Sequence, residues 1–282
     1  MRESKRLKNK FSGLIERNRW FKHVPNALTL CNSLCGFAAI LNTLQAYYYI
    51  GSPKDIINVM VLSSWIIIFA MVFDALDGFA ARIFNAASMH GIQMDSLADM
   101  VTFGVAPAVI TAILTHCLKE EMSRFQNIFV YCCCSIYLGC AALRLATYNV
   151  HAILEKKSGD KFTGLPSPGA AAAICSLMMF YADFSGPVKY LAVIAPIYAA
   201  AVGLLMVSNI PYQHVGKWLF SVRRNKKRLV ILVLILAFIA FSPYRTSAIF
   251  ALVNLYIFSG PVMAILIRIK NLVTGKPSRK TT

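Results

Sequence analysis

Long apolar runs constrain this chain more than any other feature of its sequence. A helix that spans a lipid bilayer needs about 20 mostly apolar residues, and eight segments approach or exceed that length. They cover residues 26–50, 57–82, 95–116, 125–149, 167–183, 187–207, 228–243 and 246–267. The fifth and the seventh are short, so six or seven crossings are the alternative. The sequence therefore predicts an all-α polytopic membrane protein with about eight transmembrane helices.

The uneven distribution of basic residues predicts how the chain is oriented. Of its 29 lysines and arginines, 22 fall in the two ends of the chain and in the connectors after the fourth and sixth apolar segments. Cytoplasmic segments of membrane proteins carry such an excess of positive charge. We therefore expect both termini to be cytoplasmic. The same basic residues give the chain its net charge of +17. We expect them to fix the orientation and to contact anionic headgroups, so the charge does not indicate nucleic-acid binding.

The chain has no polar stretch long enough for a second, soluble domain. Residues 1–24 mix basic residues with Phe, Leu, Ile and Trp, a pattern typical of an amphipathic helix at the membrane surface. Residues 25–210 form the main membrane domain, 211–228 a basic cytoplasmic connector, and 229–282 a C-terminal helix pair with a basic tail. The prediction is thus one membrane domain with basic extensions.

Aspartates are concentrated in one window of this apolar chain. Only 12 of the 282 residues are acidic, and four of them lie in DALDGFAARIFNAASMHGIQMDSLAD, residues 74–99. An aspartate at the bilayer centre costs about 2.5–3.5 kcal/mol, and less near a helix end such as these. Asp74 and Asp77 share one helix face, and Asp95 and Asp99 share another, because their spacings are three and four residues. A short connection joins the two helices, so we expect the two stripes to face each other at the cytoplasmic surface.

Four close carboxylates repel one another unless cations join them. Two divalent ions would balance the four charges, and oxygen ligands favour Mg²⁺ or Mn²⁺ over zinc. Such ions are commonly shared between carboxylates and substrate phosphates. Gly78, Ala81 and Gly91 keep the same faces narrow enough for a bulky ligand, and Arg82 offers a planar fork for a phosphate. The window therefore predicts four aspartates that hold two metal ions over a diphosphate, for exchange of a bond at phosphorus.

Two other classes of protein would also place carboxylates in a membrane. A divalent-cation transporter is the non-enzyme alternative, but its carboxylates would lie near the midplane on repeat-related helices. An intramembrane prenyltransferase also uses metals and a diphosphate, but takes its Asp-rich motifs from two separate helix pairs. The single window at one end of one helix pair favours neither class.

The window also resembles the signature of a known family, the CDP-alcohol phosphotransferases. The pattern D-x2-D-G-x2-A-R-x8-G-x3-D-x3-D agrees with that signature at eight fixed positions, from Asp74 to Asp99. The resemblance implies a six-helix catalytic core within residues 25–210, in which an alcohol attacks the lipid-side phosphorus of a CDP-linked lipid and CMP leaves. It also implies that the first three aspartates are chiefly metal ligands and that Asp99 is the general base. The stretch PNALT is similar to the family's P-N-x-L-T element, which implies that Asn26 and Thr29 approach the nucleotide; ordinary helix capping explains it equally well.

Two further stretches bear on the acceptor alcohol. ALRLATYNV contains Arg144, a deeply placed cation that either contacts a substrate anion or neutralises a neighbouring aspartate. KFTGLPSPGAAAA has two prolines that interrupt the start of the next helix and expose backbone groups. Both resemble elements of the bacterial phosphatidylserine synthase branch, which implies that Arg144, Asn149, Pro166 and Ser167 bind the acceptor. Thr147 stands where that branch has a second arginine, which argues against a two-arginine clamp.

The resemblance implies CDP-diacylglycerol as the lipid donor and L-serine as the acceptor, with phosphatidylserine and CMP as products. It implies a bacterial inner (plasma) membrane protein whose active site faces the cytoplasm, a homodimer, and membrane lipids as further partners. Glycerol 3-phosphate or inositol phosphate as acceptor is the alternative, but either would need more cationic residues than Arg144 alone. No nucleic-acid partner is expected.

Overall fold

The computed structural model describes residues 23–84, 88–119, 121–154, 164–183, 188–210, 212 and 245–273. Seven of the eight predicted apolar segments correspond to helices. In chain order these are α2 (Val24–Leu44) with η2 (Gln45–Tyr49), α3 (Pro53–Ile83), α4 (Met89–Asp99) continued by η3 (Met100–Val105) and α5 (Ala106–Leu118), α6 (Arg124–Leu154), α7 (Ser167–Asp183), η4 (Val188–Tyr190) with α8 (Leu191–Val207), and α11 (Arg245–Val273). The predicted segment 228–243, nearly all of the segment 1–24, and the connector 211–228 apart from Tyr212 lie outside the described residues.

Five of the helical stretches are long and apolar enough to cross a membrane. They are Val24–Tyr49, Pro53–Ala81, Met89–Leu118, Arg124–Val150 and Arg245–Leu266, and α8 is a shorter apolar helix of 17 residues. Every element that the structure describes is helical. The prediction of an all-α polytopic membrane protein is therefore confirmed, whereas the number of eight crossings stays a prediction.

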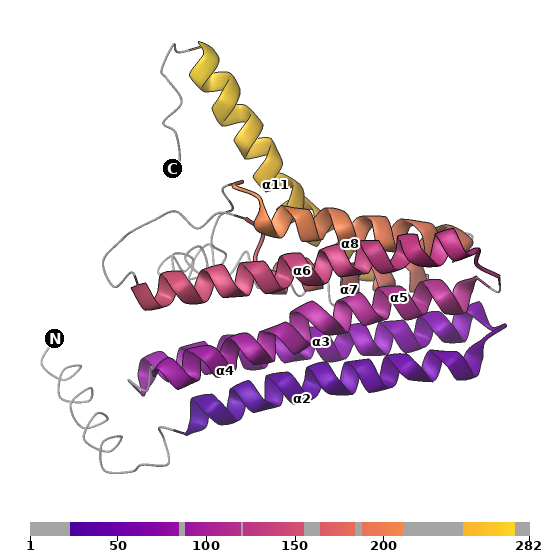
Figure 1. Ribbon diagram of the computed structural model, residues 1–282, viewed down its shortest axis with the longest axis horizontal. Helices are drawn as coiled ribbons and strands as arrows, with labels where there is room; N and C mark the ends of the chain where they lie inside the picture. The colour runs from indigo at the N-terminus through magenta and orange to yellow at the C-terminus, as the bar shows by residue number, and fades with distance from the viewer. Residues whose placement is uncertain are drawn as a thin grey trace, which may run out of the picture.

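Helices α2 to α8 lie side by side in one bundle, and α11 leaves that bundle obliquely (Figure 1). α2 packs chiefly against α3, α6 against α8, and α11 against α7. Short connections join α3 to α4 and α5 to α6, so each of these pairs is antiparallel. The ends of α3 and α4 that carry the aspartates therefore meet at the same end of the bundle.

The long helix formed by α4, η3 and α5 contains a turn of π-helix immediately after Asp99. Pro107, just beyond this turn, has no N–H and cannot donate the α-helical hydrogen bond to the carbonyl of Phe103, four residues earlier. The hydroxyl of the fully buried Tyr137 donates a hydrogen bond to that carbonyl at 2.7 Å. Since backbone polar groups inside a bilayer need a partner, this bond fastens the π-helical turn to α6.

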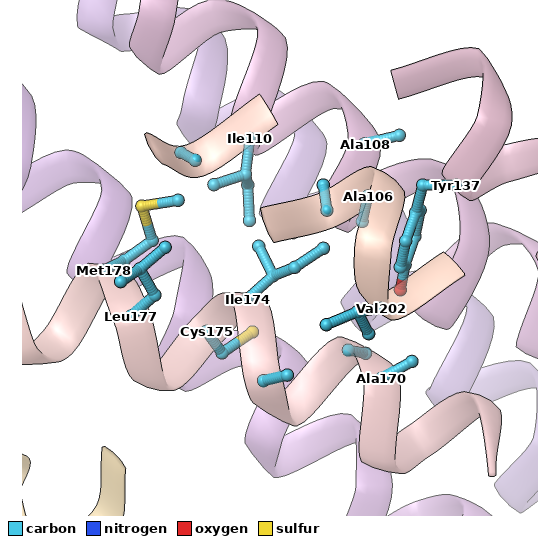
Figure 2. Packing of buried hydrophobic residues seen from close by; sticks show 14 of the residues in the cluster. Ala106, Ala108, Ile110, Tyr137, Ala170, Ile174, Cys175, Leu177, Met178 and Val202 are labelled. Carbon is cyan, nitrogen blue, oxygen red and sulfur yellow. The ribbon is translucent and has the colours of Figure 1, made fainter. Parts of the chain in front are cut away.

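The core of the bundle is built around α7, in which ten of the 17 residues are buried. Small residues at the start of this helix let its neighbours approach closely, as membrane helices require. Its buried side chains meet those of α5, α6 and α8 in one cluster (Figure 2), which includes Ala106, Ala108, Ile110, Tyr137, Ala170, Ile174, Cys175, Leu177, Met178 and Val202. This packing fixes where the first residues of α7 lie.

Candidate active site

The site begins where α3 ends and α4 starts. Ser88 caps α4, because its hydroxyl oxygen accepts a hydrogen bond from the backbone N–H of Gly91 at 3.0 Å. The connection between the two helices is only a few residues long, so the end of α3 and the start of α4 meet there, and α2 packs against both helices. The two aspartate stripes therefore come from consecutive antiparallel helices at one end of the bundle.

Three of the four aspartates gather their carboxylates at one point. Oxygen atoms of Asp74, Asp95 and Asp99 all lie within 4.8 Å of one another. At that separation each pair of ionised carboxylates would repel by about 3–4 kcal/mol in a protein-like dielectric. The Oδ1 atom of Asp95 is also buried, without a hydrogen-bond partner among the described residues. An all-oxygen set with a buried, unpaired carboxylate oxygen is suited to a hard divalent cation such as Mg²⁺ or Mn²⁺.

Asp77 occupies a different position from the other three. Its side chain is only 5% exposed, and its Oδ2 atom lies 2.8 Å from the hydroxyl of Thr29 on α2. That hydroxyl also lies 3.0 Å from the carbonyl of Pro25, and its single proton can serve only one of these acceptors at a time. Asp77 thus connects α3 to α2. The structure brings Thr29 to a carboxylate at the site.

Asn32 is a site residue that the sequence interpretation missed. Its Nδ2 atom donates a hydrogen bond to Oδ1 of Asp99 at 3.1 Å, and its backbone carbonyl accepts one from the hydroxyl of Thr102 at 3.0 Å. Asn32 is fully buried, and within the described chain its own Oδ1 has no partner. Its position three residues after Thr29 was an available signal, because both polar side chains then lie on one face of an apolar helix.

The residues predicted to bind the nucleotide and diphosphate surround the same end of the bundle. Asn26 lies against α4, with its Oδ1 atom 3.8 Å from where a Cβ on Gly91 would be. A Cβ on Gly78 would meet no atom within 4 Å, so this face of α3 is open to a ligand. Ala81 is partly buried one turn further on. Arg82 lies in the last turn of α3, and its side chain is outside the described part of the structure.

The predicted acceptor residues do not all lie together. Asn149 on α6 lies near the aspartates. Its Oδ1 atom accepts a hydrogen bond at 2.7 Å from the hydroxyl of Ser96, the residue next to Asp95. Arg144 instead reaches the end of α8, where its Nη1 atom donates to the carbonyl of Met206 at 3.3 Å.

The start of α7 carries the other two predicted acceptor residues. The Pro166 carbonyl accepts the N–H of Ala170 at 2.9 Å and so belongs to the first turn of the helix. Ser167 is 2% exposed, and its hydroxyl oxygen is buried with no partner in the described residues. Ser167 therefore retains hydrogen-bonding capacity for a ligand.

The Ser96–Asn149 bond sets the register between α4 and α6. Asp99 lies three residues further along α4, and Arg144 lies five residues back along the antiparallel α6. At about 1.5 Å of rise per residue, their depths in the bundle differ by only about 3 Å. Asp99 and Arg144 therefore lie at similar depths on two neighbouring helices.

Comparison with known proteins identifies relatives of the chain. A model of the CDP-alcohol phosphatidyltransferase family matches residues 22–207. A CDP-diacylglycerol–serine O-phosphatidyltransferase from Helicobacter pylori is 27% identical over 248 residues, which cover 87% of this chain and 95% of the relative. The Bacillus subtilis protein of the same name is 30% identical over 196 residues (69% and 92%). An archaetidylserine synthase from Methanothermobacter thermautotrophicus is 34% identical over 199 residues (69% and 71%).

Proposed function

Because the chain belongs to the CDP-alcohol phosphatidyltransferase family, a family of enzymes that use divalent metals, we propose that it transfers the phosphatidyl group of CDP-diacylglycerol to L-serine. The products are phosphatidylserine and CMP. The observation that carries the proposal is the convergence of Asp74, Asp95 and Asp99 at one end of the bundle. Relatives named as serine O-phosphatidyltransferases, among them the Helicobacter pylori and Bacillus subtilis proteins, support serine as the acceptor.

Asp74, Asp77, Asp95 and Asp99 would hold two Mg²⁺ or Mn²⁺ ions. When bound, such ions neutralise the charge of the diphosphate and of the departing CMP. The buried, unpaired oxygen of Asp95 and the 4.8 Å grouping support this assignment. We infer that Asn26, Thr29, Gly78, Ala81, Arg82 and Gly91 bind the nucleotide and the diphosphate.

Asp99 is the proposed general base. It takes the proton of the serine hydroxyl while the serine oxygen bonds to the phosphorus that carries diacylglycerol, and the bond from that phosphorus to the CMP oxygen breaks. Asn32 occupies the Oδ1 atom of Asp99, which leaves Oδ2 for the alcohol proton. We infer that Arg144, at a similar depth on α6, binds the serine carboxylate, and that Asn149, Pro166 and Ser167 also contact the acceptor.

We infer that residues 25–210 form the catalytic domain and that the site and both termini face the cytoplasm of a bacterium. This orientation gives CDP and serine, which are water-soluble, access to the site while the acyl chains remain in lipid. We also infer a homodimer, as is common in this family.

A single assay tests the proposed function. Purified protein is given CDP-diacylglycerol and Mn²⁺ with serine, glycerol 3-phosphate or inositol phosphate in parallel, and CMP release is measured. We expect serine-dependent CMP release that EDTA abolishes. Turnover with either other acceptor and none with serine would overturn the choice of acceptor, and full turnover in EDTA would overturn the metal assignment.

A further inference from the structure

Specific polar contacts fasten α11 to the bundle, beyond what a membrane anchor requires. The hydroxyl of Tyr198 on α8 donates to Oδ1 of Asn254 at 2.9 Å. The Thr246 hydroxyl, near the start of α11, donates to Asp183 at the end of α7. These bonds fix the side chains of α11 relative to α7 and α8, although the match to the family model ends at residue 207.

Tyr212 provides the third fastening. Pro261 leaves the carbonyl of Ile257 without its helical partner, and the Tyr212 hydroxyl donates to that carbonyl at 2.9 Å. A Cβ on Gly260 would lie 2.5 Å from the Tyr212 ring, so the ring rests directly on the α11 backbone. The centre of the same ring is 5.8 Å from that of Tyr256. The position of Tyr256 is therefore set by its own helix and by the segment after α8.

Tyr256 points toward the predicted acceptor residues. Its Cε1 atom lies 3.5 Å from where a Cβ on Gly169 would be, in the first turn of α7. Arg144 and Tyr256 are also close enough for each side chain to contribute to the electrostatic environment of the other. Ser167, whose buried hydroxyl oxygen has no partner among the described residues, lies two residues before Gly169.

The segment that leads into α7 is hydrogen-bonded to the residues that follow α8. Gly164 has a φ of +86°, which favours glycine, and its N–H donates to the carbonyl of Ile210 at 2.8 Å. A Cβ there would lie 2.2 Å from the Met206 carbonyl oxygen, the atom that accepts the hydrogen bond from Arg144. Arg144, Ser167 and Tyr256 are thus assembled from α6, α7 and α11 around one backbone turn.

We propose that α11 supplies Tyr256 as a positioning residue of the acceptor site, where it orients the Arg144 guanidinium toward the carboxylate of an amino-acid acceptor. A guanidinium recognises a carboxylate through two parallel hydrogen bonds, so its orientation decides how well it discriminates. The inference rests on the proposed function and deepens it, because it specifies which part of the substrate the acceptor site recognises.

The substitution Tyr256→Phe tests the inference, because it keeps the ring and its packing and removes only the hydroxyl. We expect the KM for serine to rise about tenfold, while kcat and the KM for CDP-diacylglycerol stay near the wild-type values. For serine methyl ester, which lacks the carboxylate, the substitution should raise the KM far less. In a double-mutant cycle, Tyr256→Phe should add little to Arg144→Lys, because both act on one contact.

Tyr198→Phe is the matched control, since it removes another tyrosine hydroxyl that contacts α11, and it should leave the serine KM unchanged. An unchanged serine KM in Tyr256→Phe would overturn the inference. An equal rise for serine and its methyl ester would also overturn it, because the acceptor site would then not recognise the carboxylate. Wild-type protein that releases no CMP with serine would instead reject the proposed function, and the inference with it.

Discussion

Two polar clusters lie among the apolar helices α2, α3 and α4, and they differ in how completely their groups are paired. The α2–α3 polar cluster consists of Asn42, Thr43 and Ser63. Asn42 donates to the Val59 carbonyl at 3.0 Å and to Ser63 at 2.9 Å, and Ser63 donates to the Ala39 carbonyl at 3.1 Å. The single proton of the Thr43 hydroxyl has two acceptors within reach, Ser63 at 2.8 Å and the Ala39 carbonyl at 2.7 Å. None of these three side chains has a buried polar atom without a partner in the described residues.

The aspartate cluster, which consists of Asp74, Asp95, Asp99 and the adjoining Asn32, is not closed in this way. The Oδ1 atoms of Asp95 and Asn32 are buried and unpaired within the described chain, and the three carboxylates crowd one another. A satisfied network stabilises a fold, whereas unsatisfied buried groups carry a penalty that needs an explanation. The difference teaches that polarity in a membrane helix is not by itself a sign of function; incomplete pairing is the stronger sign.

The largest effect is expected at the proposed base. Asp99→Asn keeps the shape of the side chain but removes a proton acceptor, so CMP release should fall about 10³-fold. The apparent melting temperature in detergent should fall little or rise, because one crowded negative charge is lost. A variant that keeps more than a tenth of the wild-type rate would exclude Asp99 as the base.

A smaller loss of rate is expected at Asn32. Asn32→Ala removes the hydrogen bond to Asp99 and should lower kcat by about 10- to 100-fold, because that bond joins a neutral donor to a charged acceptor. The KM for serine should change much less than kcat. If kcat is unaffected, the contact between Asn32 and Asp99 has no part in the reaction.

The smallest effect on activity is expected in the α2–α3 polar cluster. Ser63→Ala leaves Asn42 short of one acceptor, while Thr43 keeps the Ala39 carbonyl, and the variant should lose about 1–3 kcal/mol of stability. The kinetic constants at a temperature where the variant is folded should match those of the wild type. A selective loss of kcat in Ser63→Ala would remove the distinction between the two clusters.

Hydrophobicity and spacing predict the helices and the meeting of the two aspartate stripes, because both depend on neighbours in the sequence. The π-helical turn at η3 could not be predicted, and neither could the hydrogen bond from Tyr137 to the Phe103 carbonyl, because it joins two helices across 34 positions of the sequence. The contact between Asn32 and Asp99 requires the packing of α2 against α4.

The surroundings of the predicted acceptor residues could not be predicted from the sequence either. Arg144 is identifiable as a buried cation, but its contact with the Met206 carbonyl depends on where α8 ends. The approach of Tyr256 depends on how Tyr212 and Tyr198 fasten α11. The contact of Arg144 and the approach of Tyr256 to α7 each join residues more than sixty positions apart in the sequence. No periodic pattern in the sequence connects residues at such a separation.

Direct measurement of metal binding tests the central claim, namely that the aspartate cluster is a divalent-cation site. Electron paramagnetic resonance of Mn²⁺ titrated into the purified protein measures occupancy without any need for turnover. The account predicts saturable binding that weakens at least about tenfold in Asp95→Asn and stays unchanged in Ser63→Ala. Equal Mn²⁺ affinity in the wild type and in Asp95→Asn would contradict it.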